Sequence, residues 1–279
     1  MNIIIPMAGR GDRFVSAGYT DPKPLIKVNN RYVVDYVLDM YDRDNDKFTF
    51  ICNNDHLYNT DMRNILRGLA KNVIVTGMEQ HKLGPVYTVL DIVESINDDE
   101  PIIVSYCDNP VVWDYDQFKR YVIEVGADGC LISHSGFHPH TLSPTMFAYS
   151  KTDAYGRVSE VKEKECFTNN RFNEHASSGV YYFKYGHYIK KYFKQLINEN
   201  FNYNGEFYVT LVFNLLVRDG LRVFSYLNDY VLAFGTPNEV RNFEAWQTIL
   251  SGNQIHNEEE LVKCYNYWLN YKNGVTYLP

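Results

Sequence analysis

The first 25 residues constrain the fold of this chain more than any other stretch. Three adjacent β-branched residues, Ile3, Ile4 and Ile5, precede a loop that contains Gly9 and Gly11. A continuous apolar run of this kind predicts a strand buried on both faces, as in a parallel sheet. Glycines let backbone N–H groups turn toward one point, so a glycine loop that follows a strand predicts a phosphate-binding site.

Cationic residues accompany this loop. Arg10 and Arg13 lie within it, and Lys23 follows ten residues after Arg13, between Pro22 and Pro24. A guanidinium group offers N–H donors whose geometry fits phosphate oxygens, and the two prolines restrict the backbone around the lysine. The combination indicates a nucleoside triphosphate site.

The glycines alone define no known nucleotide motif. No Gly-Lys-Ser/Thr follows them, so the loop is not a P-loop, and the third glycine of a dinucleotide-binding loop is missing. Without their neighbours they fit a tight strand-to-helix turn with solvated arginines equally well.

Composition limits the classes of function. The chain has 279 residues, 45% hydrophobic and 22% charged, with a net charge of -7. This is typical of a globular protein, and the length suits one large α/β domain. The acidic total argues against a nucleic-acid binder, whereas a nucleotide needs only a few local cations.

Cysteine usage and hydropathy predict the compartment. The cysteines at positions 52, 107, 130, 166 and 264 form no C-x-x-C pair, which favours reduced thiols. The chain shows no signal-peptide pattern, and no apolar run approaches the about 18 residues of a membrane span. We therefore expect a soluble, cytoplasmic protein without a membrane partner.

The order of predicted elements indicates an α/β fold with a Rossmann-like mixed, mainly parallel sheet flanked by helices. After the first strand, the predicted strands are 48–52, 73–76 and 102–106, and the helices are 31–41, 57–69, 85–96 and 115–125. Such alternation is typical of βαβ units, whose ligands bind beyond the carboxyl ends of the strands.

The chain changes character near residue 128 without a linker or an internal repeat. The later predicted strands are 130–133, 146–150, 157–162, 178–183, 222–226 and 231–234, and the helices are 185–198, 206–217, 239–250 and 258–271. The apolar stripe of the last helix predicts packing on the body or on a second subunit, so a homo-oligomer is possible.

The N-terminal string resembles the signature of the sugar-nucleotide pyrophosphorylase (NTP transferase) family, in which G-x-G-x-R follows a strand and Pro-Lys-Pro-Leu follows at this spacing. The resemblance implies a nucleotidyltransferase fold of the GT-A type, with Arg13 and Lys23 as catalytic residues. The nucleotide-binding residues that it implies are Ala8, Gly9, Arg10 and Gly11. Asp12 is a departure, because the family usually has Ser or Thr there.

Asp108 ends the strand predicted at 102–106. Judged by its neighbours alone, it fits a polar turn better than a metal site. The resemblance implies instead that Asp108 binds Mg²⁺. Many family members carry a second metal-binding aspartate two residues before Gly-Thr-Pro, where this chain has Ala233. Either Asp229 or Glu206 replaces it, or one metal site is lost.

The segment 79–88 follows a strand and enters a helix. The resemblance implies that Gln80 and Gly84 read the nucleobase here. A side-chain amide pairs with a pyrimidine or a guanine edge, so CTP, UTP and dTTP all remain candidates. Taken singly, Gln80 fits a polar surface loop as well.

Residues 158–165 alternate like a strand, which predicts that Lys162 and Lys164 share one face. Two such lysines could simply be solvated. The resemblance implies that Lys164 binds the phosphate of an acceptor, and Lys162 is the alternative residue for this role. The resemblance further implies that Gly179 and Glu206 line the acceptor pocket.

Three histidines, His134, His138 and His140, are close in sequence. No cysteine or carboxylate joins them at the spacing of a metal site, so a loop near the acceptor pocket is the simpler interpretation.

Together these features predict an Mg²⁺-dependent nucleotidyltransferase that joins an NTP to a phosphorylated acceptor and releases pyrophosphate. A sugar 1-phosphate for surface polysaccharide synthesis is the default acceptor, and phosphocholine or a phosphorylated amino acid or amide is the alternative. The domain would comprise an NTP-binding half (1–127) and an acceptor-binding half (128–240), followed by a helical extension (241–279). The other classes left open are a GT-A glycosyltransferase and a non-catalytic nucleotide-binding protein.

Overall fold

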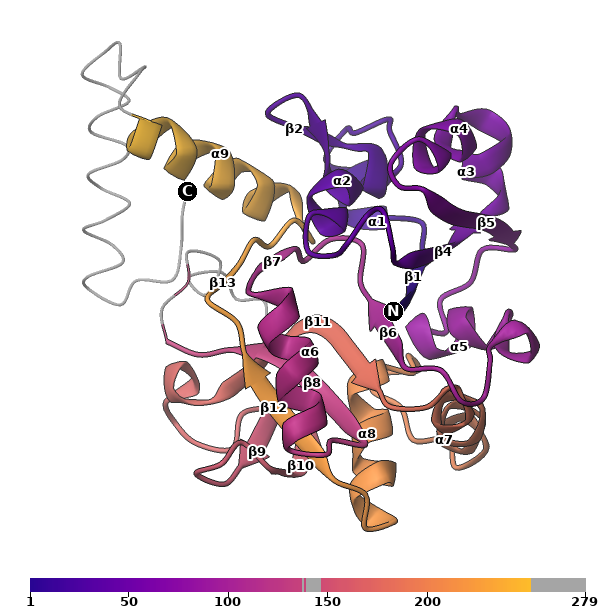
Figure 1. Cartoon of the computed structure of the whole chain (residues 1–279). Helices are drawn as coiled ribbons and strands as arrows, with labels where there is room; N and C mark the ends of the chain where they lie inside the picture. The colour runs from indigo at the N-terminus through magenta and orange to yellow at the C-terminus, as the bar shows by residue number, and fades with distance from the viewer. Residues whose placement is uncertain (137, 139–146, 252–279) are drawn as a thin grey trace.

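The computed structural model describes residues 1–136, 138 and 147–251 (Figure 1). At its centre, β1 (Asn2–Met7) lies between β4 (Lys47–Asn53) and β6 (Ile102–Ser105) and runs parallel to both. Ile3, Ile4 and Ile5 have no exposed surface. The predicted strand buried on both faces is confirmed.

The described residues contain a sheet of nine strands that runs through both halves of the chain, and the predicted fold class is confirmed. One path through it has the order β10-β9-β11-β6-β1-β4-β5, while β8 pairs with β11 and β12. The further strands are β5 (Asn72–Met78), β8 (Gly129–His134), β9 (Tyr149–Thr152), β10 (Val158–Lys162), β11 (His175–Phe183) and β12 (Val223–Leu227). Pairing is parallel around β1, whereas β11 is antiparallel to β6, β8 and β9.

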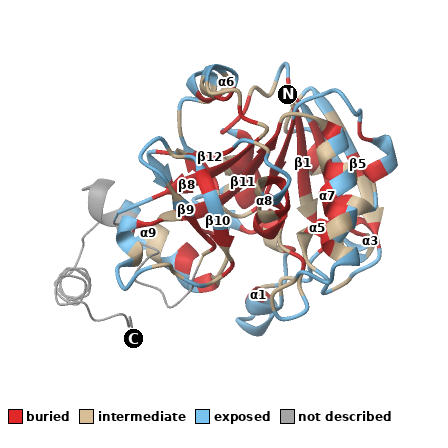
Figure 2. Cartoon of the chain, turned by 90° about the horizontal axis from the view of Figure 1, so that it is seen from below, coloured by how far each residue is buried: buried red, intermediate tan, exposed pale blue. Residues whose placement is uncertain are grey.

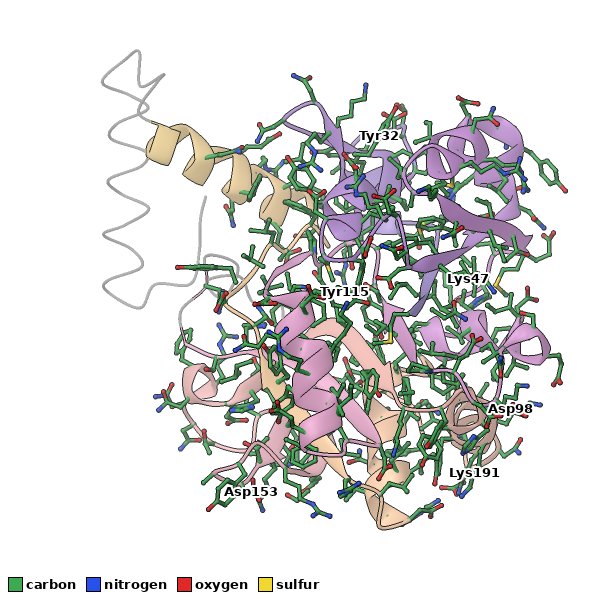
Figure 3. The ribbon with its side chains drawn as sticks, in the orientation of Figure 1. Tyr32, Lys47, Asp98, Tyr115, Asp153 and Lys191 are labelled. Carbon is green, nitrogen blue, oxygen red and sulfur yellow. The ribbon has the colours of Figure 1, made fainter. Side chains whose placement is uncertain are left out.

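Helices cover both faces of this sheet because its side chains alternate between two apolar cores (Figure 2). Ile3 and Ile5 point into the core shared with α2 (Val33–Leu38), α4 (Met62–Arg67) and α6 (Tyr115–Glu124). On the opposite face, Ile4 joins the core built with α5 (Pro85–Leu90), α7 (Gly186–Asn198) and α8 (Val209–Arg218). Charged side chains such as Lys47, Asp98, Asp153 and Lys191 are exposed (Figure 3).

Several predicted helices have different ends. The helix predicted at 57–69 is two helices, α3 (Asn54–Asn59) and α4, because Thr60 is extended between them. The prediction for 31–41 began too early, since Arg31–Tyr32 forms β3, which pairs with β2 (Lys27–Val28). The helix predicted at 206–217 starts only at Val209.

The chain beyond β12 runs back toward the centre of the sheet. Instead of a strand over 231–234, β13 (Tyr230–Val231) pairs with β7 (Val111–Val112), and α9 (Pro237–Ser251) follows. The helix predicted at 258–271 lies outside the described residues. None of the helices described in 1–136 and 147–251 has the length and apolar composition needed to span a membrane.

Replacing Gly186 by Ala should destabilise the fold by about 2 kcal/mol, because a buried contact would become overpacked. A Cβ at this first residue of α7 would lie 1.9 Å from the carbonyl oxygen of Asn97. Urea unfolding measures the loss. Gly68→Ala is the control, since its Cβ would approach no closer than 3.4 Å; an equal loss in both variants would contradict the argument.

Candidate functional site

A cavity of about 510 Å³ opens at the carboxyl ends of β1 and β6. Three segments contribute most of its wall: the loop after β1, the loop before α5 and the residues after β6. The lining residues are Pro6, Met7, Ala8, Gly9, Arg10, Gly11, Asp12, Lys23, Pro24, His81, Lys82, Gly84, Pro85, Thr88, Tyr106, Cys107, Asp108, Glu206 and Tyr208. The edge is the one at which ligands bind in parallel sheets.

The glycine loop forms one wall of the cavity and leads into α1 (Asp12–Ser16). Gly11 has a φ of 73°, in the left-handed region that glycine adopts without strain, and its carbonyl accepts from the N–H of Phe14 at 2.9 Å. Asp12 lies between two cations, 3.4 Å from Arg10 Nε and 3.3 Å from Lys82 Nζ. Arg13 is exposed and is not among the lining residues.

Lys23 and Asp108 form an ion pair at the base of the cavity. Lys23 begins a short 3₁₀ helix (Lys23–Leu25) directly after Pro22, and its Nζ donates a hydrogen bond to Oδ2 of Asp108. Burial lowers the pKa of Lys23, but the Asp108 carboxylate outweighs it and the net pKa is raised. Lys23 is therefore a fixed positive charge in the cavity.

The loop before α5 is held by His81, which sequence reasoning missed. His81 Nδ1 accepts from the N–H of Leu83 at 3.1 Å, and Nε2 lies 3.0 Å from Thr88 Oγ1. Burial lowers the pKa of this histidine, so the neutral form is favoured and Nε2–H donates to Thr88. Only the folded loop brings these partners together, and no sequence pattern marks them.

Gly84 and Gln80 have different positions in this loop. Gly84 lines the cavity with a φ of 88°, and a Cβ there would lie 2.7 Å from the backbone nitrogen and oxygen of Phe207. The loop therefore packs directly on the segment that carries Glu206. Gln80 is exposed and is not among the lining residues.

Three polar side chains, two of which line the cavity, form a chain of hydrogen bonds. Lys164 Nζ donates to the hydroxyl of Tyr208 at 2.7 Å, and that hydroxyl donates to Oε2 of Glu206 at 3.0 Å. The predicted alternation of Lys162 and Lys164 on one strand face is wrong, because β10 ends at Lys162 and Lys164 has a φ of 55°. Lys162 instead pairs with Glu165 at 2.7 Å.

Gly179 is not among the cavity-lining residues. Its carbonyl accepts from the N–H of Tyr106 at 2.8 Å, and a Cβ would lie 3.1 Å from Asn109 Nδ2. Its φ of 82° and this close approach explain why glycine occurs here. Tyr106 is the residue of this pair that reaches the cavity.

Glu163, next to Lys164, is a buried carboxyl group. It is 8% exposed, and its Oε2 accepts from Thr210 Oγ1 at 2.6 Å. Burial raises the pKa of Glu163 to about 7, although Thr210 and Lys164 act in the opposite direction. The carboxyl group therefore titrates near neutral pH.

The surroundings of Asp108 fit a divalent cation. Its carboxylate lines the cavity and already holds a positive group, the Lys23 ammonium. The described residues contain no cluster of three or more His, Cys, Asp or Glu that could hold a metal. Mg²⁺ usually takes one or two carboxylates and completes its shell with water and substrate phosphates, so Asp108 has the chemistry of one of its protein ligands.

The candidates for the missing second aspartate differ in position. The N–H of Phe234 donates to the carbonyl of Asp108 at 2.8 Å, so Ala233 lies next to Asp108. Asp229 lies away from Asp108, because its N–H donates to the carbonyl of Val112 at 3.1 Å. Glu206 lines the same cavity as Asp108 but is bonded to Tyr208.

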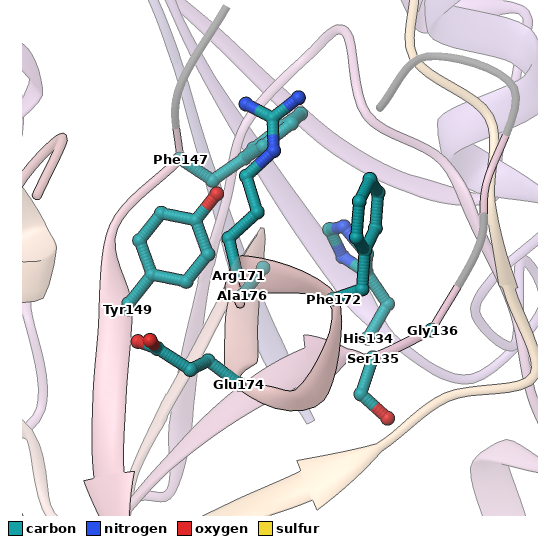
Figure 4. A pocket seen from close by; sticks show the side chains of 9 residues that line it. All are labelled: His134, Ser135, Gly136, Phe147, Tyr149, Arg171, Phe172, Glu174 and Ala176. Atoms are coloured by element: carbon teal, nitrogen blue, oxygen red, sulfur yellow. The ribbon is translucent and has the colours of Figure 1, made fainter. Parts of the chain in front are cut away.

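His134 lies at a second, much smaller cavity of about 10 Å³, enough for one water molecule (Figure 4). His134 lines it together with Tyr149, Arg171 and Glu174. The ring of His138 lies 4.7 Å from that of His134, and His140 is outside the described residues. Neither His134 nor His138 is among the residues that line the large cavity.

The sheet order, with the glycine loop and the Lys23–Asp108 pair at the carboxyl edge of β1 and β6, is that of an NTP transferase fold. The model of the MobA-like NTP transferase domain matches residues 3–171, more than half of the chain, and the chain belongs to this family. It is similar to sugar-nucleotide pyrophosphorylases, and its membership of the NTP transferase family confirms the resemblance inferred from the N-terminal signature.

Individual relatives are consistent with this family. The chain is 26% identical over 229 residues to "Bifunctional protein GlmU" of Clostridioides difficile (strain 630), covering 79% of this chain and 45% of that protein, so it spans less than half of the relative. A nucleoside-diphosphate-sugar pyrophosphorylase structure from Vibrio cholerae RC9 superposes with a TM-score of 0.70 at 21% identity, covering 87% of this chain and 99% of that one. A UDP-glucose pyrophosphorylase in complex with UDP-glucose gives 0.68 at 15% identity, covering 88% and 98%. At these identities the two structures support the fold.

Glu163→Gln should stabilise the protein at pH 8 by about 3 kcal/mol and have little effect at pH 5. The folded-state pKa of Glu163 is raised to about 7, so the wild type loses stability as pH rises through that value, whereas glutamine stays neutral. Chemical denaturation at both pH values measures the difference. Glu165→Gln, which removes an exposed carboxylate, is the control; the same pH dependence in both variants would refute this assignment.

Proposed function

We propose that the protein transfers a nucleotidyl group from CTP, UTP or dTTP to a phosphorylated acceptor and releases pyrophosphate. The observation that carries the proposal is that the glycine loop, Lys23, Asp108, Glu206 and Tyr208 all line one cavity. The cavity thus offers cationic and N–H groups for a triphosphate, and the Tyr208 hydroxyl and Glu206 carboxylate as polar groups for an acceptor.

In this reaction a phosphate oxygen of the acceptor attacks the α-phosphorus of the NTP, and the bond to the leaving pyrophosphate breaks. The attacking phosphate is already anionic, so no general base is needed, and catalysis comes from positioning and charge stabilisation. Gly9–Arg13 would hold the leaving phosphates, and Lys23 would stabilise charge on the α-phosphate. Mg²⁺, when held by Asp108, would neutralise charge on the phosphates.

The two halves of the chain would divide the substrates. We assign the NTP to residues 1–127, with Gln80 and Gly84 at the nucleobase, and the acceptor to residues 128–240, with Lys164 at its phosphate. Residues 241–279 would form an extension outside both sites. Nucleoside triphosphates are metabolites of the cytoplasm, so we place the reaction there.

A sugar 1-phosphate is the acceptor that the family relationship favours, and its product would be a precursor of surface polysaccharide. Incubating the protein with each of CTP, UTP, dTTP, ATP and GTP, with Mg²⁺ and a panel of phosphorylated acceptors, tests this by pyrophosphate release. Turnover with phosphocholine or a phosphorylated amino acid or amide would identify a different acceptor class. Hydrolysis or transfer from an NDP-sugar without pyrophosphate would identify a glycosyltransferase, and nucleotide binding without turnover a non-catalytic protein.

Lys23→Ala should lower the rate of pyrophosphate release by about 100-fold or more, as expected for the loss of one electrostatic stabiliser of the transition state. Steady-state kinetics with saturating NTP and acceptor measure the change in kcat. Lys27→Ala is the matched control, because Lys27 is exposed and is not among the cavity-lining residues. A Lys23→Ala variant that retains wild-type kcat would disprove the role.

Lys164→Met should raise the KM for the acceptor roughly tenfold, because a charge-assisted hydrogen bond to its phosphate is lost. The KM for the NTP should change much less. Lys162→Met distinguishes the two lysines: it should resemble the wild type, since Lys162 pairs with Glu165. The assignment would be reversed if only Lys162→Met weakened acceptor binding.

A further inference from the structure

The resemblance implies a second metal-binding aspartate at a position where this chain has Ala233. Ala233 lies beside Asp108, as the hydrogen bond from the N–H of Phe234 to the carbonyl of Asp108 shows. Ala233 is buried and offers no oxygen. If Asp108 binds the cation with a second protein carboxylate, that group must therefore come from another element.

The first turn of α9 supplies such a carboxylate. Glu239 is only 4% exposed although it carries an ionisable side chain. A Cβ added at Gly235 would lie 3.1 Å from Oε2 of Glu239 and 3.3 Å from Oδ2 of Asp108. The two carboxylate oxygens therefore flank the same point, which stays open because residue 235 is a glycine.

Charge balance gives a second, independent reason. In the structure the Lys23 ammonium is bonded to Asp108. Under the proposed function Lys23 turns to the α-phosphate, which leaves the buried carboxylate of Glu239 beside the carboxylate of Asp108, whose side chain is 15% exposed, without this counter-charge. Such an arrangement is strongly unfavourable unless a cation takes the place of the lysine.

We propose that Glu239 is the second carboxylate ligand of the divalent cation held by Asp108 and performs the role of the aspartate that Ala233 replaces. Asp108 and Glu239 bind the cation when Lys23 moves to the nucleotide. This inference rests on the proposed function for the movement of Lys23, but cation binding itself is measured without substrate.

Glu239 also has a structural role, which the test must separate from cation binding. Its carboxylate accepts hydrogen bonds from Thr236, and its own N–H donates to Thr236 Oγ1 at 3.2 Å. This is a capping box at the start of α9. Thr236→Ala removes the hydroxyl from this box and keeps the carboxylate, so it is a matched control for helix stability.

The experiment titrates the full-length protein, without nucleotide, with Mn²⁺ and follows the EPR signal of free Mn²⁺. Glu239→Gln should raise the Kd for Mn²⁺ at least about tenfold. Even the loss of a group that only hydrogen-bonds to a metal ligand weakens metal affinity by about tenfold or more. Asp108→Asn should have at least as large an effect. Thr236→Ala should lower the Tm but leave the Kd unchanged, as should Glu244→Gln, which removes a charge from the same helix.

Two results would overturn the proposal: a Kd for Glu239→Gln equal to that of the wild type, or an equal weakening in Thr236→Ala. Pyrophosphate release by the wild type shows separately whether the proposed function is correct. Turnover together with an unchanged Kd in Glu239→Gln would refute the role of Glu239 alone. Normal Mn²⁺ binding that depends on Glu239, without turnover on any substrate, would refute only the proposed reaction.

Discussion

The ion pair between Lys23 and Asp108 depends on the placement of β1 next to β6. Parallel neighbours end at the same edge of a sheet, so the loop after β1 and the residues after β6 meet there. In this pairing Ile3 lies opposite Ile103 and Ile4 opposite Val104, and Ile5 lies opposite Phe50 of β4. The site is therefore a consequence of strand register.

Backbone hydrogen bonds connect two of the segments that line the cavity. The N–H of Phe207 donates to the carbonyl of Leu83 at 2.9 Å, and the N–H of Val86 donates to the carbonyl of Phe207 at 3.1 Å. These bonds join the loop before α5 to the segment that carries Glu206 and Tyr208. A change in one loop on nucleotide binding would thus be transmitted directly to the wall assigned to the acceptor.

The sequence predicted what depends on local patterns and missed what depends on tertiary contacts. Apolar runs located the buried strands, and the spacing of the glycine loop and Lys23 located the cavity. By contrast, the break at Thr60 and the extended backbone before Val209 interrupt apolar periodicity that reads as continuous helix. His81 and Glu239 were missed because their partners are supplied only by the folded chain.

The acidic side chains in and beside the cavity are each matched by an internal partner. Asp12 lies between Arg10 and Lys82, Asp108 binds Lys23, and Glu206 accepts from the Tyr208 hydroxyl that Lys164 contacts. Under the proposed function, an incoming triphosphate would compete with these carboxylates for the same cations, so binding it would leave carboxylates without partners. A ligand that brings its own divalent cation would restore the balance, whereas a free anion would not. Such an exchange of partners would let a chain with a net charge of -7 select a metal-bound nucleotide.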